Sequence, residues 1–149
     1  MSLWPPPLRK DIEVAAHARI TLEYPDHLFS PDHWVNFIEL HGFRDEWKRL
    51  GLKDDDLWVL QSMIGLNPKG NPVIMGTGGL RKLRFAPPKK KGRRKWCRVC
   101  YVYFQDAAVV LLVVAYAKSE IDDISAADRK YFRQLIKREH AVYSKGSVR

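Results

Sequence analysis

Cationic side chains that could act on phosphate are concentrated between Gly76 and Gln105. This stretch holds ten of the 26 lysine and arginine residues and no aspartate or glutamate. The remaining 16 basic residues face 17 acidic ones, so the stretch accounts for all of the net charge of +9. A positive field focused on one hairpin attracts a polyanion, most often nucleic acid. The alternative is a basic loop that only keeps the protein soluble.

Two of these cations are expected on one face of a strand. The alternation from Leu80 to Ala86 predicts a strand in which Leu83 and Phe85 face the core, so Lys82 and Arg84 project to the open side. Cleavage of RNA through its own 2'-hydroxyl needs a base, an acid and positive charge beside the phosphate. Lysine crowded by other cations and bidentate arginine can supply all three. We therefore expect no metal and no cofactor.

A basic loop follows that strand. Residues 87–94 contain two prolines, one glycine and five cations, and they separate Leu80–Ala86 from a second predicted strand, Lys95–Gln105. The loop is placed to dock RNA rather than to react with it. The expected RNA-binding residues are Arg81, Lys89, Lys90, Lys91, Arg93, Arg94 and Lys95.

The two cysteines form a single C-x-x-C pair, Cys97 and Cys100. That spacing could indicate zinc or redox chemistry, but no second pair and no histidine cluster accompanies it. Residues three apart in a strand also point to opposite faces. We interpret them as two buried thiols. Nearby, Tyr101 and Tyr103 are expected in the core rather than stacked on bases.

Length and composition predict one domain, and the strands and helices expected along the chain put it in the α+β class. The chain has 149 residues, 46% of them hydrophobic, which suits a single core. The longest apolar run, Ala107–Ala117, is shorter than the roughly 20 residues of a membrane span, and the N-terminus lacks a signal-peptide core. We expect a soluble, cytoplasmic protein with no membrane partner.

The predicted elements place the cations on a small sheet. Strands are expected at 18–24, 34–40 and 80–86, and a meander continues through 95–105 and 109–118. Helices are expected at 43–50, after Asp54, and from Ser125 toward Val142, where Ser125 and Asp128 resemble a capping box. The turn at Gly76–Gly79 lacks the lysine and helix of a phosphate-binding loop, so we expect it to need positive φ angles.

The order of these motifs resembles a known family. Leu66-Asn67-Pro68, the glycine turn running into residues 80–84, Cys97–Tyr101 and Lys118-Ser119-Glu120 are similar to the RelE/ParE superfamily of toxins, most of all its HigB branch. The resemblance implies a RelE-like fold, with a small twisted antiparallel sheet flanked by helices. It divides the chain into an N-terminal extension (1–32, partly disordered or one added strand), a toxin domain (33–143) and a frayed tail (144–149).

The resemblance also implies a function. It indicates the toxin of a type II toxin–antitoxin pair, an mRNA interferase that cleaves mRNA on the ribosome and inhibits translation. Its partner would be a helix-turn-helix antitoxin. The implied catalytic residues are Lys82, Arg84, Arg98 and Lys118. Ser119 stands where RelE-type members often place another catalytic arginine, so the identity of the general acid stays open.

Two alternatives of other classes remain. The chain could be a non-catalytic toxin on the same scaffold that acts by binding, as the gyrase-poisoning ParE toxins do. It could also be a basic RNA-binding domain. The density of cations on the two central strands favours the nuclease.

Overall fold

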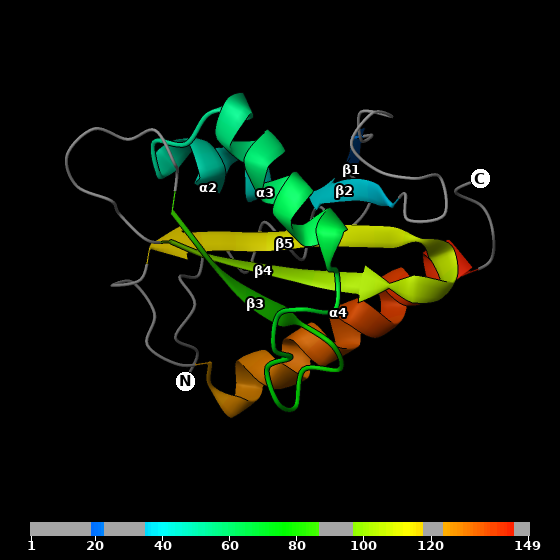
Figure 1. Cartoon of the computed structure of the whole chain (residues 1–149). Helices are drawn as coiled ribbons and strands as arrows, with labels where there is room; N and C mark the ends of the chain where they lie inside the picture. Colours follow the sequence, from blue (N-terminus) through cyan, green and yellow to red (C-terminus); the bar gives the residue numbers. More distant parts are fainter. Residues whose placement is uncertain (1–18, 23–34, 87–96, 118–123, 145–149) are drawn as a thin grey trace.

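A single five-stranded sheet forms the centre of the computed structural model, with helices on both faces (Figure 1). The structure describes residues 19–22, 35–86, 97–117 and 124–144. The strands lie in the order β1-β2-β5-β4-β3. They are β1 (Arg19–Leu22), β2 (Asn36–Leu40), β3 (Arg81–Phe85), β4 (Cys97–Phe104) and β5 (Val109–Ala117). Helices α2 (Phe43–Arg49) and α3 (Asp54–Leu66) cover one face, and α4 (Ala126–Ser144) covers the other. The predicted α+β class, with a small sheet flanked by helices, is confirmed.

The expected antiparallel sheet is wrong in one pairing. Strands β3, β4 and β5 form the predicted antiparallel meander, and β1 pairs antiparallel with β2. However, β2 pairs parallel with β5, with Asn36 opposite Val109 and Glu39 opposite Leu112, so the sheet is mixed. A parallel pair needs a long crossover. Here the chain passes through α2, α3, β3 and β4 before it returns as β5, and local strand patterns do not encode that direction.

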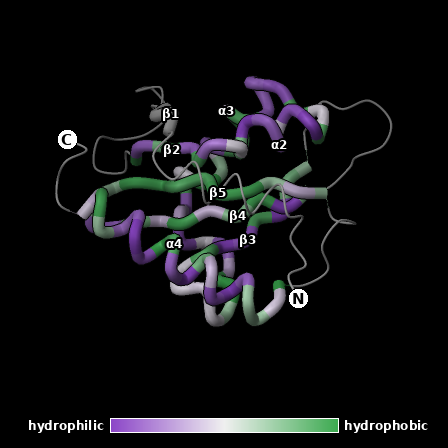
Figure 2. Tube along the Cα trace, turned by 180° about the vertical axis from the view of Figure 1, so that it is seen from behind, coloured by the Kyte–Doolittle hydropathy of each residue, from purple (hydrophilic) through white to green (hydrophobic). Residues whose placement is uncertain are grey.

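Strand β5 is the buried axis of the sheet. Every residue from Val109 to Tyr116 is buried, which is typical of a strand covered on both faces. Figure 2 shows β5 apolar along most of its length, between the more polar helices. Its side chains join two separate cores, one under α4 and one under α2 and α3. Both layers of helices therefore depend on this strand.

A β-bulge changes which face the end of β5 presents. Cys100 pairs with Val114 but Tyr101 pairs with Leu112, so Val113 is an extra residue in β5. Val113 and Val114 consequently both join the core under α4. Tyr116 then lies on the α4 side of the sheet as well. Without the extra residue, period-two alternation would have pointed Tyr116 to the opposite face.

Helix α4 begins at the predicted cap. The hydroxyl of Ser125 accepts a hydrogen bond from the backbone N–H of Asp128 at 3.1 Å, which satisfies one of the unpaired donors of the first turn. Its buried stripe contains Phe132, Leu135, Ile136 and Tyr143. No helix in the described parts of the chain is long and apolar enough to cross a membrane.

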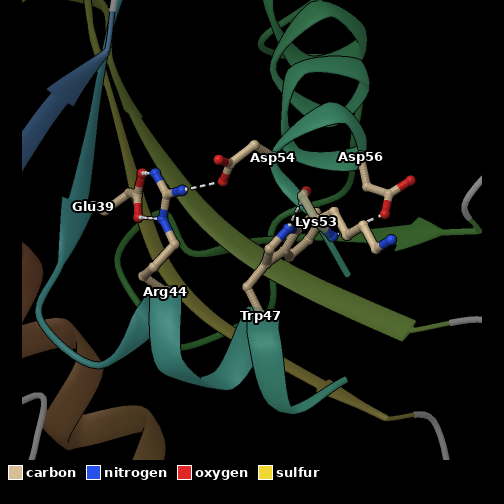
Figure 3. A network of polar contacts seen from close by, with 6 residues as sticks. All are labelled: Glu39, Arg44, Trp47, Lys53, Asp54 and Asp56. Atoms are coloured by element: carbon tan, nitrogen blue, oxygen red, sulfur yellow. Dashed lines mark hydrogen bonds and ion pairs between the residues drawn. The ribbon is translucent and has the colours of Figure 1, made fainter. Parts of the chain in front are cut away.

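Trp47 fixes the two short helices on the other face. Its side chain is fully buried, and its ring lies 5.9 Å from that of Phe43 and 5.5 Å from that of Phe85. The indole Nε1 donates to the carbonyl oxygen of Lys53 at 3.0 Å, at the start of α3 (Figure 3). The carboxylate of Asp56 accepts a hydrogen bond from the N–H of Lys53. Trp47 therefore links α2, the sheet and the first turn of α3.

A charged network beside Trp47 joins the same elements. Glu39 of β2 is only 2% exposed, and Arg44 of α2 donates to both of its carboxylate oxygens, at 3.0 and 2.7 Å (Figure 3). Another nitrogen of Arg44 donates to Asp54 at 2.7 Å. The hydrogen bond to Glu39 raises the pKa of the Arg44 guanidinium. Arg44 thus gives the buried Glu39 carboxylate a bidentate partner of opposite charge.

Replacing Arg44 with methionine should destabilise the fold strongly. The substitution keeps the aliphatic stem but leaves the Glu39 carboxylate buried without its partner, a change that costs about 3–5 kcal/mol. Urea unfolding would measure this loss. Asp54→Asn removes only the exposed partner, so it should have a small effect. The double variant Glu39→Gln/Arg44→Met should recover much of the lost stability. Equal losses for Arg44→Met and Asp54→Asn would contradict this account.

Candidate nucleic-acid interface

Three of the four implied catalytic cations lie together on the α4 side of the sheet. In the register of β3 and β4, Arg84 is directly opposite Arg98, and Lys82 is opposite Cys100. Lys82 and Arg84 are exposed, whereas the Leu83 and Phe85 side chains between and beyond them are buried in the α2–α3 core. The predicted alternation of this strand is therefore confirmed.

The third strand contributes an aromatic and a thiol to the same surface. Tyr116 of β5 is opposite Arg98 of β4, on the face to which Cys100 also points. A hydrogen bond joins Tyr116 to the Cys100 sulfur, and the charges of Lys82 and Arg98 both act on this thiol. Tyr116 and Cys100 thus form a buried floor beside the three cations.

The positive charges of Arg84 and Arg98 lie close together although they repel each other. Like charges directly opposite one another in an antiparallel pair destabilise a sheet. In addition, Nη1 of Arg98 is buried and has no hydrogen-bond partner within the part of the chain that the structure describes. A buried guanidinium nitrogen without a partner is costly. The exposed side chains of Lys82 and Arg84 beside Arg98 make this surface attractive to an anion, and phosphate oxygens match the guanidinium geometry.

Arg81 points the other way. It is opposite Tyr101, on the α2–α3 side of the sheet, and its Nη1 donates to the carbonyl oxygens of Lys69 and Asn71 at 3.0 and 2.6 Å. The Tyr101 hydroxyl donates to Pro68 at 2.8 Å and accepts from Asn71 at 3.1 Å. Arg81 therefore anchors the loop after α3 and is not brought together with the other three cations. The expected core position of Tyr101 is confirmed, and Tyr103 is half-buried.

The glycine turn adopts the predicted backbone. Gly76, Gly78 and Gly79 have φ angles of 82°, 78° and 126°, in the region that favours glycine. Close packing adds a second constraint, because a Cβ at Gly78 would meet Arg133 of α4 at 3.4 Å. Arg133 also donates to the Gly76 carbonyl oxygen at 2.8 Å. The turn is thus fixed to α4 immediately before β3 begins.

The remaining predicted site residues lie outside the described residues. They are Lys118, Lys89, Lys90, Lys91, Arg93, Arg94 and Lys95. Ser119 also lies outside them. Their assigned roles stay predictions.

A hollow beside the C-terminal end of β4 was not predicted from the sequence. This cavity of about 700 Å³ is lined by residues that include Gly79, Tyr103, Asp106 and His140. His140 Nε2 lies 2.9 and 3.0 Å from the two Asp106 oxygens, and this hydrogen bond lowers the pKa of Asp106. The His140 ring stacks on Phe104 at 5.1 Å. No local pattern joins residues 34 positions apart, so only the fold shows this pair.

The cysteines occupy opposite faces, as predicted. Cys97 packs in the core under α2 and α3, and Cys100 in the core under α4, and both are free thiols. Burial raises the pKa of Cys97 to about 11 and that of Cys100 to about 12. The two sulfurs cannot bind one metal ion together from opposite sides of the strand.

Comparison with models of known protein families finds no match to this chain.

Both thiols should resist modification in the native protein. A thiol reagent at pH 8 should label neither Cys97 nor Cys100 until urea unfolds the chain, because each is buried and protonated. A Lys48→Cys variant, with its thiol on the exposed side of α2, should react at once as a control. Rapid labelling in native buffer would contradict the burial.

The raised pKa values also predict how the free energy of unfolding depends on pH. The two thiols contribute fully to stability below about pH 8.5, the usual pKa of an unfolded thiol. This contribution should fall as the pH rises toward the pKa values of the folded state, because the unfolded thiols lose their protons first.

Removing the charge of Arg98 should not weaken the fold. Arg98→Met keeps the packed stem while it removes the repulsion with Arg84, so the melting temperature should stay the same or rise slightly. Arg44→Met is the matched control, and its melting temperature should fall. A large loss of stability in Arg98→Met would show that this arginine is a structural residue.

Proposed function

We propose that this chain is the toxin of a type II toxin–antitoxin pair, an endoribonuclease of the RelE/HigB type that cleaves mRNA on the ribosome. The observation that carries the proposal is the grouping of Lys82, Arg84 and Arg98 on one face of two paired strands. Functional sites commonly retain charges at a cost to stability. The motif order described for the sequence supports the same class of protein.

The three cations have different capacities in the proposed reaction. Arginine does not deprotonate in proteins, so Arg84 and Arg98 are assigned to the phosphate oxygens and to the charge that develops in the transition state. Lys82 is the one member of the three that can exchange a proton, and it is assigned as the base for the 2'-hydroxyl. That hydroxyl attacks the adjacent phosphorus, the bond to the 5'-oxygen breaks, and the leaving oxygen takes up a proton from water. The products are a 2',3'-cyclic phosphate and a 5'-hydroxyl.

The proposed partner is an antitoxin, and an apolar surface away from the cations supports a protein partner. On α3, Leu66 is 73% exposed, and Trp58 and Met63 are also exposed. Exposed aromatic and methionine side chains are enriched in protein interfaces. These three residues belong to the helix layer on the α2–α3 side of the sheet, whereas the cation cluster faces the α4 side.

The central test is cleavage of ribosome-bound mRNA by the purified protein. Lys82→Ala or Arg98→Ala should lower the cleavage rate by about 10² or more, in line with the loss of an acid–base group or a charge-stabilising group. Mapping the cut ends should give a cyclic phosphate upstream and a 5'-hydroxyl downstream. Lys48→Ala, an exposed cation on α2, is the matched control and should leave the rate unchanged.

Two outcomes would contradict the mechanism. One is full activity in the Lys82→Ala/Arg98→Ala double variant. The other is continued cleavage of a message that carries a 2'-deoxynucleotide at the cut site, because the attacking hydroxyl is then missing. If ribosomes or RNA are bound normally but no cut is found under any condition, the binding alternatives replace the nuclease.

A further inference from the structure

Every exposed charge on α4 is positive. The helix carries five cations, Arg129, Lys130, Arg133, Lys137 and Arg138, and two acidic residues, Asp128 and Glu139. Both acids are buried, at 1% and 2% exposure, so they do not reach the outer surface. No ion pair joins Lys130, Lys137 or Arg138 to an acidic side chain among the described residues. The outer face of α4 is therefore uniformly basic.

The spacing arranges these cations as a row. Lys130 and Lys137 lie seven residues apart, which is two helical turns or about 10 Å along the axis. Arg133 and Arg138 flank the line between them at helical spacing. Arg133 is held by the Gly76 carbonyl oxygen, and α4 itself is packed on the sheet through Phe132, Leu135 and Ile136. The charges are thus mounted on a rigid element.

The opposite layer differs in charge. On α2 and α3, Arg44 pairs with Glu39 and Asp54, and Arg49 pairs with Glu46. The first turn of α3 adds Asp55 and Asp56. Exposed carboxylates accompany the cations of that side, whereas α4 exposes no carboxylate of its own. Among the described residues, the excess of positive charge therefore lies on the side of the sheet that carries α4, Lys82, Arg84 and Arg98.

The chemistry of the α4 face favours a phosphate backbone over a protein. Val142, near the C-terminal end, is the one large hydrophobic residue of α4 that is exposed, so the row lacks the apolar anchors of a protein interface. None of the exposed side chains of α4 is a phenylalanine, tyrosine or tryptophan, so the row also lacks a platform for unpaired bases. A charged row without anchors or stacking side chains suits sequence-independent contact with the backbone of double-stranded RNA.

We propose that the outer face of α4 docks on the phosphate backbone of a structured, double-helical RNA, separately from the strand cations that we assign to the cleaved message. Lys130, Lys137 and Arg138 make the contacts, with Arg133 between them. The docking needs RNA binding alone, so it does not depend on whether Lys82 and Arg98 cleave RNA. A protein that acts on the ribosome would meet such an RNA helix beside its message.

The test compares two triple variants with the same loss of charge. Lys130→Ala/Lys137→Ala/Arg138→Ala removes the row, and Lys48→Ala/Lys53→Ala/Lys69→Ala removes three exposed lysines from the α2–α3 side. Binding to an RNA duplex of scrambled sequence, measured by fluorescence anisotropy over a range of salt, should weaken on the order of tenfold in the first variant. Its log–log salt slope should fall by about 3, one for each lost phosphate contact. The control should bind like the wild type.

The outcomes separate this proposal from its rivals. Equal losses in both triple variants would mean that net charge alone governs binding, and the docking surface would be overturned. An α4 variant that binds the duplex normally but no longer binds a polyglutamate peptide would reassign the row to an acidic protein. If the wild-type protein binds the duplex but never cleaves ribosome-bound mRNA, the nuclease assignment fails while the α4 surface stands.

Discussion

Burial of β5 on both faces is the constraint on which the rest of the structure depends. An apolar strand of this kind must be covered by helices on two sides, and it needs a paired strand along each edge. Strand β2 supplies one edge and β4 the other, while α2 with α3 and α4 supply the two layers. The pairing of β5 with β4 brings Tyr116 opposite Arg98, and the pairing of β3 with the other edge of β4 brings Arg84 opposite Arg98. The site is thus positioned by a strand that carries no charged residue of its own.

The bulge at Val113 connects this central strand to the candidate site. Because the extra residue reverses the alternation, Tyr116 faces the same side as Arg98 and Cys100 instead of the core under α2 and α3. Meanwhile α4 covers the far end of β4, where Phe104 lies against His140 and Tyr143. The cations occupy the opposite end of the same strand. The sheet face is consequently divided between a packed half and a half in which Lys82 and Arg84 are exposed.

The sequence predicted the features that depend on strand alternation and on helix capping. Alternation placed Lys82 and Arg84 on the open face and separated the two cysteines, and side-chain capping placed the start of α4 beside Ser125. The parallel pairing of β2 with β5 could not be predicted, since it results from the path of the whole chain. The same alternation puts Arg81 on the side of Leu83 and Phe85, which contradicts its expected place in the RNA-binding surface. What local period could not show is that carbonyl oxygens in a loop ten and twelve residues away hold its guanidinium. The pair of His140 with Asp106 is a product of tertiary packing in the same way.

The two layers of helices differ in how their charges are paired. On the α2–α3 side, Arg44 is matched by Glu39 and Asp54, so its charge contributes to holding β2, α2 and α3 together rather than to the external field. On α4, burial of Asp128 and Glu139 removes the acids that would otherwise neutralise the exposed cations. The positive charge of α4 then adds to that of Lys82, Arg84 and Arg98 on the same side of the sheet. The positive potential of the described residues is therefore highest on that side, while the exposed apolar side chains of α3 lie on the other.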